Sequence, residues 1–193
     1  MLHIGLTGGI GSGKSSTAKI FHTLGIPVYY SDERAKWLMR NESELKEAIQ
    51  KQFGSSIYNE GELDREKLAD IVFDEPESLS SLNRIVHPRV RIDFLNWASQ
   101  QNSFPYLIQE AAILIETGSW NKLDGIVLVT APLELKIERV MKRDSVSRES
   151  VENRITSQSN DASRVPFSDF VVVNDGVQSL VKQVLDIHRR IID

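Results

Sequence analysis

A glycine-rich loop near the start of the chain places the strongest constraint on its fold. The stretch HIGLTGGIGSGKSSTAKIF, residues 3–21, holds five glycines between Gly5 and Gly13. Gly8 to Ser15 matches G-x-x-x-x-G-K-[ST], between an apolar run that suits a buried strand and a segment with helical periodicity. Glycines let successive backbone N–H groups approach a phosphate, and a helix N-terminus adds further donors. The stretch therefore predicts a strand, a phosphate-binding loop and a helix, in that order.

The same loop predicts how a nucleoside triphosphate is held. The Lys14 ammonium can reach the outer phosphates, and the Ser15 hydroxyl can ligate Mg²⁺. The dinucleotide fingerprint G-x-G-x-x-G cannot be placed on these glycines. We therefore expect a triphosphate and Mg²⁺ rather than a dinucleotide.

The remaining apolar runs predict an α/β fold with a parallel five-stranded sheet flanked by helices. They are short and bounded by turn residues, which is typical of strands covered on both faces. Strands are expected over 2–7, 27–30, 106–110, 125–130 and 170–173, with helices over 15–24 and 177–192.

Two long connections predict helical insertions in this core. Only helical periodicity is found between Tyr30 and Tyr106, a connection far longer than a crossover requires. A second helical segment covers residues 132–163. We expect one domain with its core at about 1–31, 104–135 and 166–193, an inserted helical lobe at about 32–103 and a further helical segment at about 136–165.

Composition excludes several classes of protein. The net charge of −4 argues against a duplex nucleic-acid binder. With no cysteine, disulfides, thiolate metal sites and cysteine nucleophiles are excluded. The apolar runs are too short to span a bilayer, and no export signal is evident. We expect a cytoplasmic protein that acts on small molecules, with no nucleic-acid, membrane or obligate protein partner.

Asp32 follows the second expected strand, at the edge where α/β sheets bind ligands. Its carboxylate could accept the proton of an attacking hydroxyl. It could equally cap a helix that begins at Glu33. Both interpretations are compatible with the sequence.

Two arginines, Arg139 and Arg143, are four residues apart and share one helix face. Neither has an acid three or four residues away, so a polyphosphate between them would relieve their repulsion. A solvated basic face is the alternative. Further arginines extend this segment, which we expect to form a lid: Arg148, Arg154 and Arg164.

The stretch LNRIVHPRV brings Arg84, His87 and Arg89 close together in the inserted lobe. Pro88 disfavours helix at His87, so we expect a break between two helices there. Cations at this break could receive an anionic acceptor, although a capping histidine fits equally well.

A GTPase is disfavoured by the sequence. NKLD, residues 121–124, resembles the guanine-reading N-K-x-D but precedes its strand instead of following it. No D-x-x-G is present to serve as a switch. We interpret NKLD as a polar turn.

Most of the chain resembles the dephospho-coenzyme A kinases. The matching stretches are IGLTGGIGSGKS, GELDREKLADIVF, LNRIVHPRV, LIETG, RVMKRD, RITSQ and VVVNDG. The resemblance implies a P-loop core with a helical coenzyme A lobe and a lid. It also implies MgATP-dependent phosphorylation of the ribose 3′-hydroxyl of dephospho-coenzyme A, the last step of coenzyme A synthesis.

The resemblance also implies roles for individual residues. Asp32 would lie near the accepting hydroxyl and Asn174 beside the adenine, while Tyr30 and Ala112 depart from the family pattern. The residues expected to hold ATP are Gly11, Ser12, Gly13, Lys14, Ser15 and Ser16, with Arg139 and Arg143 in the lid and Arg84, His87 and Arg89 on the acceptor. A nucleoside monophosphate kinase and a nucleotide-binding switch remain as alternatives.

Overall fold

A parallel sheet organises the first of two units formed by the chain. The computed structural model describes residues 1–74 and 76–193. The core unit comprises Met1–Tyr30 and Gln101–Asp193, and the helical unit comprises Ser31–Gln100.

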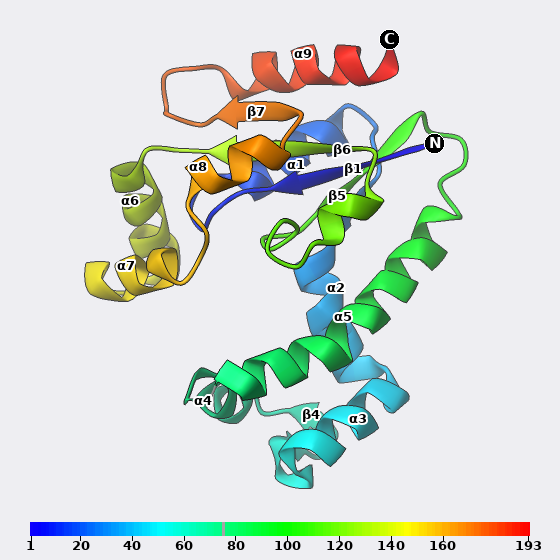
Figure 1. Cartoon of the computed structure of the whole chain (residues 1–193), viewed down its shortest axis with the longest axis vertical. Helices are drawn as coiled ribbons and strands as arrows, with labels where there is room; N and C mark the ends of the chain where they lie inside the picture. The colour runs from blue at the N-terminus through cyan, green and yellow to red at the C-terminus, as the bar shows by residue number, and fades with distance from the viewer. Residues whose placement is uncertain (75) are drawn as a thin grey trace. The chain divides into compact units, whose positions relative to one another are not determined.

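The sheet of the core unit has five parallel strands in the order β2-β5-β1-β6-β7 (Figure 1). The strands are β1 (Leu2–Thr7), β2 (Val28–Tyr30), β5 (Tyr106–Glu110), β6 (Gly125–Thr130) and β7 (Phe170–Val173). The predicted α/β fold is therefore confirmed, and only β2 differs from its expected bounds, by one residue.

The central strand β1 is almost completely buried beyond its first two residues. Ile4 and Leu6 pack in the main core, as expected for a strand covered on both faces. A methyl group at Gly5 would lie only 2.6 Å from the Ile126 side chain and 2.8 Å from that of Leu123. Close packing beside the strand therefore requires glycine there.

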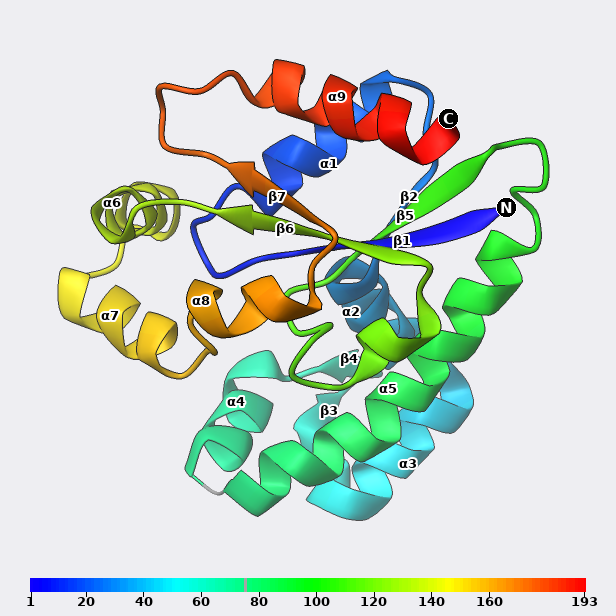
Figure 2. The same ribbon diagram turned by 45° about the horizontal axis from the view of Figure 1, so that its top comes forward.

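Helices cover both faces of this sheet, as Figure 2 shows for α1 and α9 on one side and α8 on the other. The helices α1 (Lys14–Thr23) and α9 (Leu180–Ile192) bury Phe21 and Val184 in the main core. The helices that follow β6 are α6 (Leu133–Asp144), α7 (Arg148–Thr156) and α8 (Asp161–Arg164), and the short 3-10 turns are η2 (Ser119–Lys122) and η3 (Val165–Phe167).

The helical unit is built around one long helix, α5 (Pro76–Ala98). It contacts α2, α3 and α4. The other elements are α2 (Ser31–Asn41), α3 (Ser43–Phe53), η1 (Ser55–Ile57), β3 (Tyr58–Asn59), β4 (Glu62–Leu63) and α4 (Arg65–Asp74).

The helical unit corrects two predictions. No strand was expected here, yet β3 and β4 pair as a small antiparallel hairpin. Glu60 and Gly61 both have positive φ, at 49° and 86°, as tight hairpin turns require.

The break expected at His87 is wrong, because α5 continues through Pro88. Proline removes one backbone donor from the helix interior. Val86, Val90 and Phe94 lie four residues apart and are all buried. Their packing against the rest of the helical unit keeps both halves of α5 in one helix.

The described residues, 1–74 and 76–193, include no helix that is both long and apolar enough to cross a membrane.

Candidate active site

The loop Gly8–Gly13 connects the end of β1 to the start of α1. Gly11 and Gly13 have φ values of 76° and 100°, in the region that favours glycine. A methyl group at Gly11 would lie 2.5 Å from the Lys136 carbonyl oxygen, and one at Gly13 would overlap the Asn174 amide nitrogen. Both glycines are therefore required by conformation and by close contact.

The first turn of α1 is suited to an anion. Its N-cap is Gly13, and no side chain caps the helix. The free N–H groups and the positive end of the helix dipole therefore remain available. Ser15 and Ser16 lie in this turn and are exposed. The described geometry matches a cradle for phosphate oxygens.

Lys14 places a positive charge within the loop. Its ammonium donates to the carbonyl oxygens of Gly8, at 2.8 Å, and Gly9, at 3.4 Å. The charge is therefore held inside the loop.

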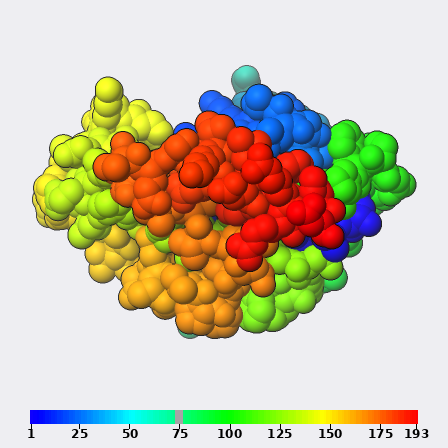
Figure 3. Space-filling view, turned by 90° about the horizontal axis from the view of Figure 1, so that it is seen from above, coloured from blue at the N-terminus to red at the C-terminus, as the bar shows by residue number. Residues whose placement is uncertain are grey.

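The surface beside the loop is hollowed. Figure 3 shows a notch between α1, in blue, and the helices α6 and α7, in yellow-green and yellow. The loop leads into α1 beside this notch.

Asn174 and Arg139 brace the loop. The Asn174 side chain donates to the Ser12 carbonyl oxygen at 2.8 Å. Arg139 donates to the Gly11 carbonyl oxygen at 3.4 Å and to the Asn174 backbone and side-chain oxygens at 3.1 and 3.2 Å. Two residues singled out in the sequence thus lie at the loop.

Arg143 has a different environment from Arg139. It donates to both carboxylate oxygens of Asp144, at 2.7 and 3.0 Å, and its side chain is 63% exposed. The acid that pairs with Arg143 is the next residue in the chain, not one at the i±3 or i±4 positions of the helix. Arg154 also pairs with Asp144, at 3.0 Å.

The other arginines expected in the lid are also paired with acids. Arg148 pairs with Glu134 and Glu152. Arg164 is buried rather than on a basic face. The structure therefore does not show an open basic face formed by Arg148, Arg154 and Arg164.

The NKLD stretch lies at the end of the sheet opposite the loop. The Asp124 carboxylate accepts from the His3 N–H at 2.7 Å, beside the beginning of β1. Because the phosphate-binding loop follows the end of β1, Asp124 cannot read a base beside that loop. The interpretation of NKLD as a structural turn agrees with this contact.

In the helical unit, Asp32 lies in the first turn of α2 and is exposed. The helix begins at Ser31, so Asp32 lies inside it rather than at its N-cap. Burial lowers the pKa of His87 below its ordinary value, while the charge of Asp32 acts in the opposite direction. Asp32 therefore lies close enough to His87 for its charge to act on the imidazole.

The three cations expected together on α5 are only partly grouped. Arg84 and His87 are three residues apart and share a face, whereas Arg89 lies about 160° around the helix from His87. Arg84 donates to the Ser81 hydroxyl at 2.9 Å and is exposed. Arg89 pairs with Glu42 and, at 2.7 Å, with Glu44. The expected grouping is wrong for Arg89, because the helix does not break.

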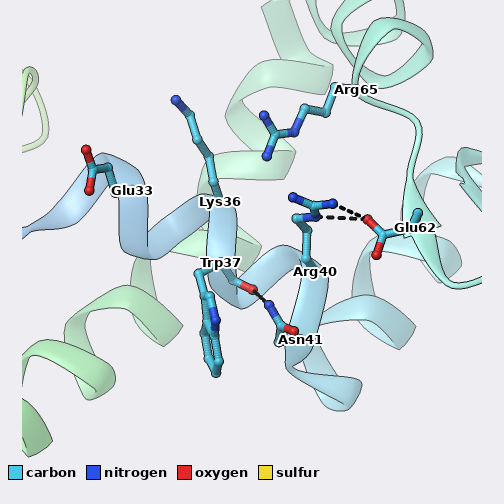
Figure 4. A pocket seen from close by; sticks show the side chains of 7 residues that line it. All are labelled: Glu33, Lys36, Trp37, Arg40, Asn41, Glu62 and Arg65. Atoms are coloured by element: carbon cyan, nitrogen blue, oxygen red, sulfur yellow. Dashed lines mark hydrogen bonds and ion pairs between the residues drawn. The ribbon is translucent and has the colours of Figure 1, made fainter.

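Sequence reasoning missed an open cavity of about 420 Å³ in the helical unit (Figure 4). Arg40 donates to Glu62 at 2.9 and 2.5 Å. Lys36 and Arg65 make no ion pair with the residues that the structure describes. The i,i+4 spacing of Lys36 and Arg40 on α2 could have indicated a basic face. The cavity is lined by Glu33, Lys36, Trp37, Arg40, Asn41, Glu62 and Arg65.

Comparisons with known proteins agree with these features. The family model described as dephospho-CoA kinase matches residues 2–179. The chain is 38% identical to the dephospho-CoA kinase of Bacteroides fragilis, covering 96% of this chain and 91% of the relative. It is 41% identical to that of Porphyromonas gingivalis, covering 97% and 93%.

Solved structures show the same fold. TT1252 from Thermus thermophilus matches with a TM-score of 0.87 and 34% identity, covering 100% of this chain and 98% of that one. Dephospho-CoA kinase from Campylobacter jejuni matches with a TM-score of 0.70 and 24% identity, covering 98% and 96%. The family model and the curated relatives identify the chain as a member of the dephospho-CoA kinase family.

Proposed function

We propose that this chain transfers the γ-phosphoryl group of ATP to the ribose 3′-hydroxyl of dephospho-coenzyme A. Membership of the dephospho-CoA kinase family carries the assignment of the reaction, which completes coenzyme A synthesis. The observation in the structure that supports it best is the glycine cradle at the uncapped start of α1, with the Lys14 ammonium inside it. We place the protein in the cytoplasm, where this synthesis takes place.

The proposed ATP site runs from Gly11 to Ser16. Its backbone N–H groups and the Lys14 ammonium would bind phosphate oxygens. The ammonium interacts more strongly with a charged phosphate oxygen than with the neutral carbonyl oxygens that it contacts here. Asn174 and Arg139 would keep the loop in shape, with Asn174 close enough to border the nucleotide.

The donor set also fits Mg²⁺. The Ser15 hydroxyl is exposed in the first turn of α1. No group of three or more His, Asp or Glu side chains that could enclose a metal is found among the described residues. Mg²⁺ is commonly held by few protein ligands together with substrate phosphates and water. When bound, it would neutralise charge on the phosphates, with Ser15 as its protein ligand.

Asp32 is the proposed acceptor of the hydroxyl proton. Its carboxylate is exposed, so a substrate hydroxyl can reach it. A carboxylate positioned in this way would accept the proton as the oxygen bonds to the transferred phosphoryl group. Arg139 and Arg143 would stabilise the negative charge of that group.

The helical unit is the proposed acceptor lobe, and residues of about 136–165 are the proposed lid. Lys36 and Arg65 would bind the diphosphate of dephospho-coenzyme A, because Glu62 already neutralises Arg40 in the same cavity. Arg84 and His87 are the other proposed acceptor contacts. Arg89 is a weaker candidate, since Glu42 and Glu44 hold it.

The decisive experiment compares acceptors at saturating MgATP: dephospho-coenzyme A, adenosine, AMP, GMP, CMP and dTMP. Dephospho-coenzyme A should be phosphorylated far faster than any other, because contacts remote from the hydroxyl also stabilise the transition state. Efficient phosphorylation of a nucleoside monophosphate, with none of dephospho-coenzyme A, would make a nucleoside monophosphate kinase the correct assignment.

Variants in the cavity test the acceptor contacts separately. Lys36→Ala and Arg65→Ala should raise the KM for dephospho-coenzyme A and leave the KM for ATP unchanged. Adenosine lacks the diphosphate, so its weak turnover should not respond. Lys51→Ala, which removes an exposed cation of α3 outside the cavity, is the matched control. Equal KM values in all three variants would remove Lys36 and Arg65 from the acceptor site.

A further inference from the structure

A cluster of four charged side chains lies beside the first half of the phosphate-binding loop. Its centre is Arg164, the last residue of α8, whose side chain is 0% exposed. The other members come from three separate places in the chain: Glu116 after β5, Lys136 on α6 and Asp161 at the start of α8. We call these four residues the Arg164 cluster.

The Arg164 cluster balances its own charge. Arg164 donates to one carboxylate oxygen of Glu116 from Nε, at 3.0 Å, and from Nη2. The Lys136 ammonium donates to Asp161 at 2.5 Å. Two cations therefore face two carboxylates, as buried charges require. A neutral cluster has no excess charge with which to bind an anion. Its role therefore depends on the part of the loop that it lies beside.

Gly9 of the loop faces the Arg164 cluster. A methyl group built on Gly9 would lie 3.4 Å from Arg164 Nη1, 3.5 Å from Lys136 Nζ and 3.6 Å from Asp161 Oδ1. Three members of the cluster thus line the space beside Gly9 that a methyl group would occupy. The backbone of Lys136 also lies close to Gly11, where a methyl group would be 2.5 Å from its carbonyl oxygen.

The Nη1 nitrogen of Arg164 is the guanidinium atom that faces Gly9. Nη1 is buried and has no hydrogen-bond partner among the described residues, although Asp161 Oδ1 lies 3.7 Å away. An unpaired buried donor is rare in proteins and is a cost to stability. Glu116 fixes the other edge of the guanidinium, which keeps Nη1 facing Gly9.

The lid helices also contact the residues that follow Gly9. The Ile10 side chain packs against the buried cluster of Ile137, Val140 and Val151, and its N–H donates to Gln158 at 2.9 Å. The base of the lid and the first half of the loop therefore form one packed body.

We infer that Arg164 is a positioning residue for phosphoryl transfer: through Glu116, Asp161 and Lys136 it fixes the Gly9–Ile10 segment before ATP binds. The inference rests on the proposed role of the loop in binding ATP. A loop that is fixed beforehand needs no reorganisation when the phosphates arrive, which favours both binding and catalysis. Arg164 itself does not touch the substrate in this scheme.

The first test compares Arg164→Met with Arg148→Met. Both arginines lie in the lid and make two hydrogen bonds to a glutamate, but Arg148 and its partner Glu134 are on the surface. Arg164→Met should lower kcat/KM for ATP by roughly 10²-fold, because small displacements of a binding loop are costly to catalysis. Arg148→Met should change it by no more than about twofold, as for other exposed ion pairs. The KM for dephospho-coenzyme A should be unchanged in both variants.

A second comparison separates positioning from stability. The double variant Glu116→Leu with Arg164→Met removes both charges together, which restores stability in many buried ion pairs. If Arg164 positions the loop, the melting temperature should recover while kcat/KM for ATP stays low. Recovery of both quantities to the wild-type values would overturn the inference and leave the cluster a purely structural role.

Arg164→Lys keeps the test decisive if the methionine variant does not fold. Lysine retains the charge but cannot make the two-point contact with Glu116. A fluorescent ATP analogue should bind more weakly to this variant than to wild type, and unchanged affinity would overturn the inference. Because this binding is measured without an acceptor, it is independent of whether wild type phosphorylates dephospho-coenzyme A.

Discussion

The Asn174 side chain donates a 2.8 Å hydrogen bond to the carbonyl oxygen of Ser12, which lies 162 positions earlier in the chain. This bond joins the end of β7 to the phosphate-binding loop. The same Asn174 nitrogen occupies the place that a methyl group on Gly13 would need. The loop can keep this contact only with glycine at position 13.

Gly13→Ala should therefore weaken both folding and ATP binding. Gly25→Ala is the matched control, because Gly25 has a similar φ of 81° with no atom near its missing methyl group. The control should lose about 1–2 kcal/mol of unfolding free energy from left-handed backbone strain and keep its ATP affinity. Denaturant unfolding and binding of a fluorescent ATP analogue measure the two effects. If both variants lost the same unfolding free energy and kept the same ATP affinity, the Asn174 side chain would be able to move aside at little cost.

Asp32→Asn should slow turnover by roughly 10²–10⁴-fold if the carboxylate accepts the hydroxyl proton. ATP should still bind, because Asp32 belongs to the helical unit rather than the loop. Glu66→Gln, in the first turn of α4, controls for the loss of a negative charge at a helix start. Wild-type turnover with a lowered melting temperature would limit Asp32 to stabilising α2.

Arg139→Ala and Arg143→Ala should have different effects. Arg139 supports the Gly11 carbonyl, so its loss should weaken ATP binding as well as turnover. Arg143 is held by Asp144 in the described state, so its loss should lower kcat with little change in affinity. If both stabilise one phosphoryl group, a double-mutant cycle should give non-additive effects. Small, strictly additive losses would show that the two arginines do not act on one phosphoryl group.

His87 should make stability depend on pH. Burial holds its pKa below the ordinary value of 6.5 in the folded chain, against the opposing charge of Asp32. The unfolded chain therefore binds a proton at a pH where folded His87 is still neutral. The free energy of unfolding rises with pH wherever the unfolded state binds more protons, so stability should fall as pH drops below about 6.5.

Unfolding measured from pH 7.5 to 5 checks this direction. His87→Gln should flatten the slope, and the exposed His22 provides the control variant His22→Gln. An unchanged slope in His87→Gln would assign the pH dependence to other groups.

The parts of the fold that were predictable carry local signals. The strand, glycine loop and helix around Lys14 follow from neighbouring residues, and β1, β5, β6 and β7 follow from short apolar runs. At Pro88 the local rule gave the wrong answer, because packing along α5 outweighs one lost donor. Because α5 is continuous, Arg89 and His87 lie on different faces of it.

The Arg164 cluster has no local signal at all. Arg164 and Glu116 are 48 positions apart, and nothing in either neighbourhood marks them as partners. Only the folded chain brings such residues together. For the segment expected to form a lid, the sequence could therefore predict the helices and an excess of arginine, but not which arginine would be buried.

The strand order β2-β5-β1-β6-β7 also has a consequence for how the chain folds. The central strand β1 pairs Leu2 with Tyr106 and Ile4 with Gly125, so both neighbours of β1 are made about a hundred residues after it. During synthesis on the ribosome, β1 is expected to remain an unpaired apolar segment until the whole helical unit has been made. Closing such long loops is slow, so formation of the β1–β5 and β1–β6 pairs is expected to limit the folding rate. Until then β1 is the segment most exposed to aggregation, and the one that a chaperone would best protect.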